Sequence, residues 1–229
     1  WQYIGNALDE RRAYRPFFSW ALGESPAYAL HTHYDMPHVV GRFLDALLGS
    51  AELAGEQPDA EVERLLTGLL FGTISPHDAL GWSDTGAADI PEALIHDQRE
   101  MLYALADLIR FRDSEDARRA CANFCRSVQR LIGDRDTFPG YALRATGWDV
   151  GEGHAFFYAP TNSGRLVHAL LRYYRLGQDD VALDLARRFA DDNRARCFTE
   201  DGRLTAAAGI HLHSVEGTVE GMLELGLLL

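Results

Sequence analysis

Apolar residues recur along the chain in two helical patterns. In the first pattern they fall three or four positions apart, so that one side of the predicted helix is apolar and the other side is polar. In the second pattern they occupy almost every side, which is typical of a helix buried on most sides. The first pattern covers residues 59–70, 117–132 and 181–192, and the second covers residues 37–50, 99–111, 164–176 and the stretch from residue 216. The chain is therefore predicted to be all-α, with buried helices alternating with half-exposed ones.

The two patterns alternate as an internal repeat. Aligning the buried segments on Arg42, Arg99 and Arg165 gives spacings of 57 and 66 residues. Each repeat has a buried helix, a short turn with breaking or capping residues, an amphipathic helix and a long loop. This order predicts an inner and an outer helical layer, as in an α/α toroid or an open α-solenoid. The apolarity of the inner helices favours the toroid, because the concave face of a solenoid is usually wetter.

Three and a half helical hairpins are visible, so residues 1–229 are expected to form a single, partial α/α-toroid domain. A ring of six hairpins at this period would need about 350 residues. We therefore expect that the ring is incomplete in this chain or that the chain is a fragment.

Charge and composition narrow the classes of partner. The chain has 229 residues, of which 47% are hydrophobic, and its net charge of −12 disfavours nucleic acid or an anionic membrane surface as a partner. No apolar run is long enough to span a membrane. All 22 basic residues are arginine, which excludes a lysine Schiff base or a P-loop from this chain. Cys121, Cys125 and Cys197 show no disulfide pattern, and the first two share the apolar face of a predicted helix.

Side chains that can carry chemistry gather in the long loops. Because each long loop enters an inner helix, the loops are expected to open at one mouth of the domain. Aromatic rings, carboxylates, histidines and arginines around a cavity suit a carbohydrate, whose rings stack on tryptophan and whose hydroxyls take hydrogen bonds. The side chains expected to bind such a substrate are His33, Trp82, Arg144, Trp148, Asn162, Arg165 and His211.

Glycoside hydrolysis needs a proton donor at the leaving oxygen and a second group for the water or the anomeric carbon. Aspartate and glutamate usually supply both groups. Asp149 or Glu152 is the predicted acid, and Asp35 or Asp84 is the predicted base or nucleophile. Turn formation competes with catalysis at Asp84, Asp149 and Glu152, because all three lie in glycine-containing segments.

A polysaccharide lyase would instead remove the proton beside a uronate carboxyl group. Histidine or tyrosine can act as the base, while asparagine or arginine neutralises the acid. The candidates for these roles are His154, His213, Tyr158, Asn162 and Arg165. The negative charge of the whole chain mildly disfavours a polyanionic substrate, although Arg144 and Arg165 could hold one uronate locally.

The stretch HTHYDMPH, residues 31–38, offers histidines at metal-site spacing. It resembles the H-x-H-x-D-H signature of metallo-β-lactamase-like hydrolases, but two extra residues precede its last histidine and that fold needs glycine-rich strands. A second H-x-H pair, His211 and His213, lies in an equivalent loop, and two such pairs could bind zinc. Neither pair comes with further ligands at a fixed spacing. We therefore expect an acid/base and sugar-binding loop with no metal or other cofactor.

The repeated stretches GRFLDALL, REMLYALA and GRLVHALL, with aromatic and acidic loops before them, resemble the inner helices of six-hairpin α/α-toroid glycosidases and polysaccharide lyases. HLHSVEGTVEGMLEL is similar to the start of an inner helix in that superfamily. The resemblance covers most of the chain but is architectural, so it implies an oligosaccharide or polysaccharide substrate without choosing the reaction. We expect a glycoside hydrolase, with a polysaccharide lyase and a non-catalytic helical-repeat binding protein as alternatives.

Overall fold

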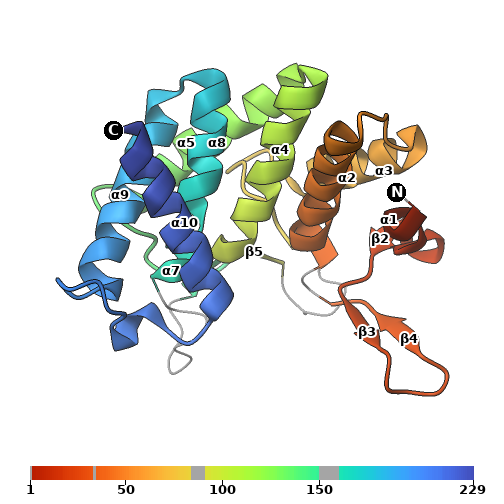
Figure 1. The fold of residues 1–229 in the computed structure, drawn as a ribbon, viewed down its shortest axis with the longest axis horizontal. Helices are drawn as coiled ribbons and strands as arrows, with labels where there is room; N and C mark the ends of the chain where they lie inside the picture. Colours follow the sequence, from red (N-terminus) through yellow and green to blue (C-terminus); the bar gives the residue numbers. More distant parts are fainter. Residues whose placement is uncertain (1, 33–34, 84–90, 150–159) are drawn as a thin grey trace.

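The protein is described by a computed structural model that covers residues 2–32, 35–83, 91–149 and 160–229 (Figure 1). The described residues are mostly helical, which confirms the predicted helical class. The inner helices are α2 (Val40–Ala54), α4 (Gln98–Arg112), α8 (Leu166–Gly177) and α10 (Leu212–Leu228). The outer helices are α3 (Ala60–Thr73), α5 (Glu115–Ile132) and α9 (Asp180–Cys197).

The inner helices pack side by side in chain order. Figure 1 shows α2, α4, α8 and α10 as neighbours, and each packs against the next. Helices α2, α4 and α8 also pack against the outer helix that follows them, and α5 packs on α9 in the outer layer. The predicted order of paired helices in two layers is thus present in the described chain.

Side chains in the short turns start the outer helices. Asp59 Oδ1 accepts hydrogen bonds from the backbone nitrogens of Glu61 and Val62 before α3. Ser114 and Asp179 cap α5 and α9 in the same way. Such caps satisfy backbone donors that a helix leaves unpaired at its first turn. The turns predicted from sequence therefore also fix where each outer helix begins.

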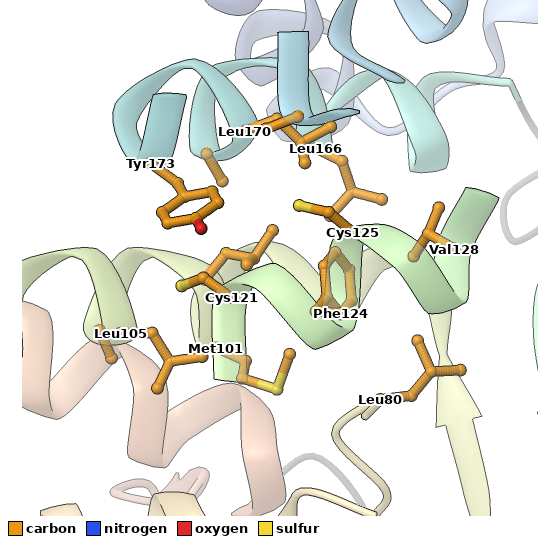
Figure 2. Packing of buried hydrophobic residues seen from close by; sticks show 14 of the residues in the cluster. Leu80, Met101, Leu105, Cys121, Phe124, Cys125, Val128, Leu166, Leu170 and Tyr173 are labelled. Atoms are coloured by element: carbon orange, nitrogen blue, oxygen red, sulfur yellow. The ribbon is translucent and has the colours of Figure 1, made fainter. Parts of the chain in front are cut away.

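The main hydrophobic core lies between the two layers. Figure 2 shows part of it, where Phe124 of α5 lies among apolar side chains that include Met101 of α4 and Leu166 of α8. Cys121 and Cys125 are buried in this core and form no disulfide, as their shared apolar face predicted. Burial raises the pKa of both thiols, which makes them unreactive at neutral pH.

Short antiparallel strands and turns fill the connections. The strands are β1 (Leu8–Asp9), β2 (Arg15–Pro16), β3 (Ser19–Ala21), β4 (Tyr28–Leu30), β5 (Glu92–Leu94), β6 (Ala142–Arg144) and β7 (Gly147–Asp149). The short helices are α1 (Gln2–Asn6), η1 (Glu10–Arg12), η2 (Asp35–Val39), η3 (Ile95–Asp97), α7 (Thr161–Gly164) and η4 (Ala206–Ala208). Strand β6 pairs with both β5 and β7, so one small sheet joins the loops that enter α4 and α8.

The inner helices carry polar residues that contact one another across the layer. Helix α4 carries Arg99, Tyr103 and Asp107 at successive four-residue intervals, and these contact polar residues of its neighbours. The Tyr103 hydroxyl lies 2.9 Å from His168 Nδ1, and Arg172 Nη2 donates to Asp107. Because polar contacts also join the inner helices, their apolarity does not distinguish a closed ring from an open solenoid.

Glycines allow the inner helices to approach closely. A Cβ atom built on Gly41 of α2 would lie 2.5 Å from the Glu100 carbonyl oxygen of α4. A Cβ atom on Gly221 of α10 would lie 2.8 Å from the His168 backbone nitrogen of α8. Both distances are too short for any larger residue without movement of a backbone. This close packing brings the starts of the inner helices together.

Candidate functional site

The starts of all four inner helices meet through charged side chains. Arg42 of α2 and Arg165, at the start of α8, both donate to Glu100 of α4. Arg99 of α4 contacts His213 of α10, with 3.2 Å between Arg99 Nη2 and His213 Nε2. These contacts join segments that are far apart in the sequence.

Three arginines converge on a single carboxylate. Glu100 Oε1 lies 3.2 Å from Arg42 Nη2, 2.7 Å from Arg99 Nη2 and 3.0 Å from Arg165 Nη2. Arg42, Arg99 and Arg165 are the positions on which the sequence repeat aligns, so one residue from each repeat contributes. We call these three residues together with Glu100 the arginine cluster. Arg99 and Arg165 are buried with Glu100, while the Arg42 side chain is 41% exposed and reaches solvent.

Positive charge exceeds negative charge inside the arginine cluster. Burial opposes the ionisation of Glu100, but the arginines outweigh it and hold the pKa of its carboxyl group below the ordinary value. Burial, followed by the charge of Arg99, lowers the pKa of Arg165 to about 10. Arginine side chains stay charged in proteins, so three guanidinium groups face one carboxylate here. A second anion would find favourable electrostatics here.

The second H-x-H pair borders the arginine cluster. His211 Nδ1 lies 2.7 Å from Ser214 Oγ at the start of α10, and the rings of His211 and His213 lie 5.7 Å apart. Burial, followed by the charges of Arg165 and Arg99, lowers the pKa of His213 to about 4. Burial and Arg165 also lower the pKa of His211. Both imidazoles are therefore neutral at pH 7, so each has a nitrogen that can accept a proton.

Two further histidines share a buried aspartate beside the arginine cluster. His38 Nδ1 lies 2.8 Å from Asp97 Oδ1, and His96 Nε2 lies 2.7 Å from the same oxygen. We call these three residues the histidine–aspartate cluster. Burial opposes the ionisation of Asp97, yet the two imidazoles hold its pKa below the usual range. Burial also lowers the pKa of His38. Two imidazoles and one carboxylate are a donor set that could hold a metal ion.

The stretch HTHYDMPH is divided between two sets of contacts. His31 Nδ1 lies 2.7 Å from Asp35 Oδ2, and His31 Nε2 lies 3.1 Å from Asp9 Oδ2. Thr32 donates its backbone N–H to Asp35, which is fully buried. Asp35 therefore anchors the N-terminal segment to the start of α2, while His38 turns towards α4.

Arg144 and Asp149 pair with each other on the small sheet. Arg144 Nη2 lies 3.0 Å from both Glu92 Oε2 and Asp149 Oδ2. Trp148 packs its ring against Phe138, with the ring centres 5.6 Å apart. Arg144, Trp148 and Asp149 are thus held by strands β6 and β7 and their neighbours. Asn162 lies in α7, three positions before Arg165, and is partly buried.

Trp82 lines a different cavity. Its indole Nε1 donates to Asp78 Oδ1 at 3.0 Å. The cavity has a volume of about 650 Å³ and is lined by residues of α3, Met36 and the segment around Trp82, with no residue of the arginine cluster. Trp82 therefore borders a separate hollow on the α3 side of the molecule.

Five predicted site residues lie outside the described residues: His33, Asp84, Glu152, His154 and Tyr158. The sequence did not identify Glu100, His96 and Asp97 as site residues. It used Arg99 only to align the repeats and gave it no role in binding. Each of these lies within four residues of an aligned repeat position, at the start of α4. Polar residues next to an aligned arginine, in or just before an otherwise apolar helix, would have indicated these positions.

Comparison of the sequence with models of known protein families and with curated proteins gives no match. Within the described ranges, no helix combines the length and apolarity needed to cross a membrane. Function is therefore inferred from the contacts of the arginine cluster and its neighbours.

Proposed function

We propose that this protein is a carbohydrate-active enzyme of the α/α-toroid type that binds an acidic sugar at the arginine cluster and cleaves the chain by β-elimination. The convergence of three repeat-equivalent arginines on Glu100 is the observation that carries this proposal. The two packed helical layers support the toroid, and closure of the ring is part of the proposal.

A uronate carboxylate fits the charge of the arginine cluster. Arginine presents a planar fork of donors that matches a carboxylate, and three such groups share only one carboxylate here. Arg42 and His213 each have solvent-accessible surface and would meet the sugar first. The net charge of −12 does not prevent this, because salt screens exposed charges beyond about 8 Å at physiological ionic strength. Local charge therefore decides which sugar can bind.

Elimination needs a base, a neutralised carboxylate and a proton for the leaving group. In the proposed reaction Arg99 turns from His213 Nε2 to the uronate carboxylate, which frees the lone pair of that nitrogen. His213 Nε2 then takes the proton from the carbon next to the carboxylate, whose negative charge the arginines stabilise. The electron pair of that C–H bond forms a carbon–carbon double bond as the bond to the glycosidic oxygen breaks. The departing oxygen takes a proton from a general acid, for which His154 and Tyr158 remain the sequence-based candidates.

The contacts of two carboxylates favour elimination over the hydrolysis expected from sequence. A hydrolase needs two carboxyl groups that flank the scissile bond. Asp35 is fully buried and bonded to His31 and Thr32, and Asp149 is paired with Arg144. Asp84 and Glu152 lie outside the described residues, so the hydrolase is retained as an outcome of the test.

Product chemistry on a panel of polyuronates and neutral polysaccharides tests the proposal. Elimination gives new reducing ends together with the ultraviolet absorbance of an unsaturated uronate. We expect both signals on a polyuronate and neither on neutral glycans. His213→Gln should lower kcat by roughly 100-fold or more, whereas His77→Gln, an exposed histidine in the loop after α3, should leave kcat unchanged.

Three other results of the same experiment would each point to a different conclusion. Reducing ends without the absorbance would replace elimination by hydrolysis and return the catalytic role to the carboxylates. Saturable binding of a polyuronate with no product would support the non-catalytic binding protein. Absence of both binding and cleavage on every polyuronate would overturn the acidic-sugar assignment.

A further inference from the structure

The histidine–aspartate cluster has the geometry of a metal site. The cluster joins two elements, because His38 lies at the start of α2 while His96 and Asp97 form the turn before α4. One potential ligand atom from each residue lies within 4.8 Å of the other two. Both imidazoles approach the same oxygen, Asp97 Oδ1, and the rings of His38 and His96 are 5.6 Å apart. Three potential ligand atoms therefore lie close together at the starts of α2 and α4.

A second observation concerns the other oxygen of the same carboxylate. Asp97 is 1% exposed, and among the described residues its Oδ2 atom has no hydrogen-bond partner. A buried carboxylate oxygen without a partner costs free energy, so native proteins rarely leave one unsatisfied. A bound cation would give this oxygen the partner that no described hydrogen-bond donor supplies.

We propose that His38, His96 and Asp97 bind a divalent transition metal ion of the Zn²⁺ class. Imidazole nitrogen and carboxylate oxygen are common zinc ligands, and three protein ligands leave a position for water or a substrate oxygen. Ca²⁺ and Mg²⁺ prefer sites made of oxygen ligands, which disfavours them at a site with two imidazoles. This site uses neither of the two H-x-H pairs and differs from the sequence expectation of no cofactor.

This site lies beside the arginine cluster but is built on a different carboxylate. Glu100 lies three positions after Asp97 and engages all three arginines, so the Asp97 carboxylate is left to the two imidazoles. The His38 side chain is buried, whereas the His96 side chain is 13% exposed. His96 is therefore the more accessible of the two imidazoles.

Zinc titration of the untagged, chelator-treated protein tests this site. Isothermal titration calorimetry should give one equivalent of Zn²⁺, and Co²⁺ should bind with visible absorbance that Zn²⁺ abolishes by competition. His96→Gln and Asp97→Asn should each weaken binding by roughly 100-fold or more. The matched control is His168→Gln, which removes a histidine of α8 that lies 3.4 Å from the Glu220 carboxylate, and it should leave the affinity unchanged.

Three results would overturn the metal site. The first is the absence of saturable Zn²⁺ binding to the wild-type protein. The second is equal affinity in folded His96→Gln and wild-type proteins, as judged by circular dichroism. The third is loss of binding in the His211→Gln/His213→Gln double variant, which would move the site to that pair. If Asp97→Asn and His96→Gln both fail to fold, the Co²⁺ spectrum of the wild type decides, because absence of nitrogen-ligand bands excludes this site.

Discussion

At the scale of single residues, Glu100 organises the candidate site by holding the arginines in place. Its carboxylate collects one guanidinium group from each of three repeats. Arg99 also depends on a residue that has no side chain, because a Cβ atom on Gly217 of α10 would lie 2.6 Å from Arg99 Nη1. Gly217 is therefore expected to maintain the position of Arg99.

Gly217→Ala should weaken binding of an acidic oligosaccharide while the protein remains folded. The new methyl group would displace the end of the flexible Arg99 side chain, and loss of one charge-assisted hydrogen bond corresponds to roughly tenfold or more in affinity. Gly226→Ala is the matched control, because no atom lies within 4 Å of the added methyl group on the same helix. Calorimetric affinities of the two variants check this. Equal affinities would show that Gly217 does not position Arg99.

His213 should govern the acidic limb of the pH profile. It must be neutral to accept a proton, and burial together with the nearby arginines lowers its pKa to about 4. Activity should therefore persist down to about pH 5 and fall below about pH 4, well under the ordinary histidine pKa of about 6.5. Arg42→Gln removes one positive charge and should move the limb to higher pH. An acidic limb near pH 6.5 in the wild type would contradict this role of His213.

At the scale of elements, the polar stripe along the inner helices was not predictable from periodicity. The hydrophobic pattern located the helices within a few residues, because burial on one side repeats every three or four positions. It could not show that Tyr103 and Asp107 point towards partners on α8, since such contacts depend on how neighbouring helices are aligned. Asp107 illustrates this, because Arg172 joins it to Asp45 and so links α4, α8 and α2.

Asp107→Asn should flatten the dependence of stability on pH. Burial, reinforced by Asp45 and opposed by Arg172, raises the pKa of Asp107 from 3.8 to about 8. Between these values the folded state holds a proton that the unfolded state has released, so stability falls as pH rises through this window. The asparagine variant lacks this contribution.

Urea unfolding at pH 5 and pH 8 measures this effect. The free energy of unfolding should fall more between the two pH values in the wild type than in Asp107→Asn. Asp191→Asn removes the same charge from an exposed position on α9 and should behave like the wild type. An equal fall in the Asp107→Asn protein would show that Asp107 is ionised throughout.

At the scale of the whole molecule, the sequence repeat predicted more than the individual motifs did. Aligning the helices placed Arg42, Arg99 and Arg165 at equivalent positions, and the sequence predicted a substrate-binding role for Arg165 alone. The structure brings them to one carboxylate, because equivalent helix starts in neighbouring repeats lie side by side. The H-x-H motifs were less informative, since His31 pairs with Asp9 and Asp35 while the unmarked His96 joins His38 through Asp97.

The central claim is that the arginine cluster selects an acidic sugar, and one binding measurement tests it most directly. Calorimetry would compare a uronate oligosaccharide with its methyl ester, which has the same sugar chain without the charge. We predict at least roughly tenfold tighter binding of the acid, and a much smaller difference in Arg42→Gln, whose partly exposed side chain can change without disturbing the core. Equal affinity for the acid and the ester in the wild type would contradict the account.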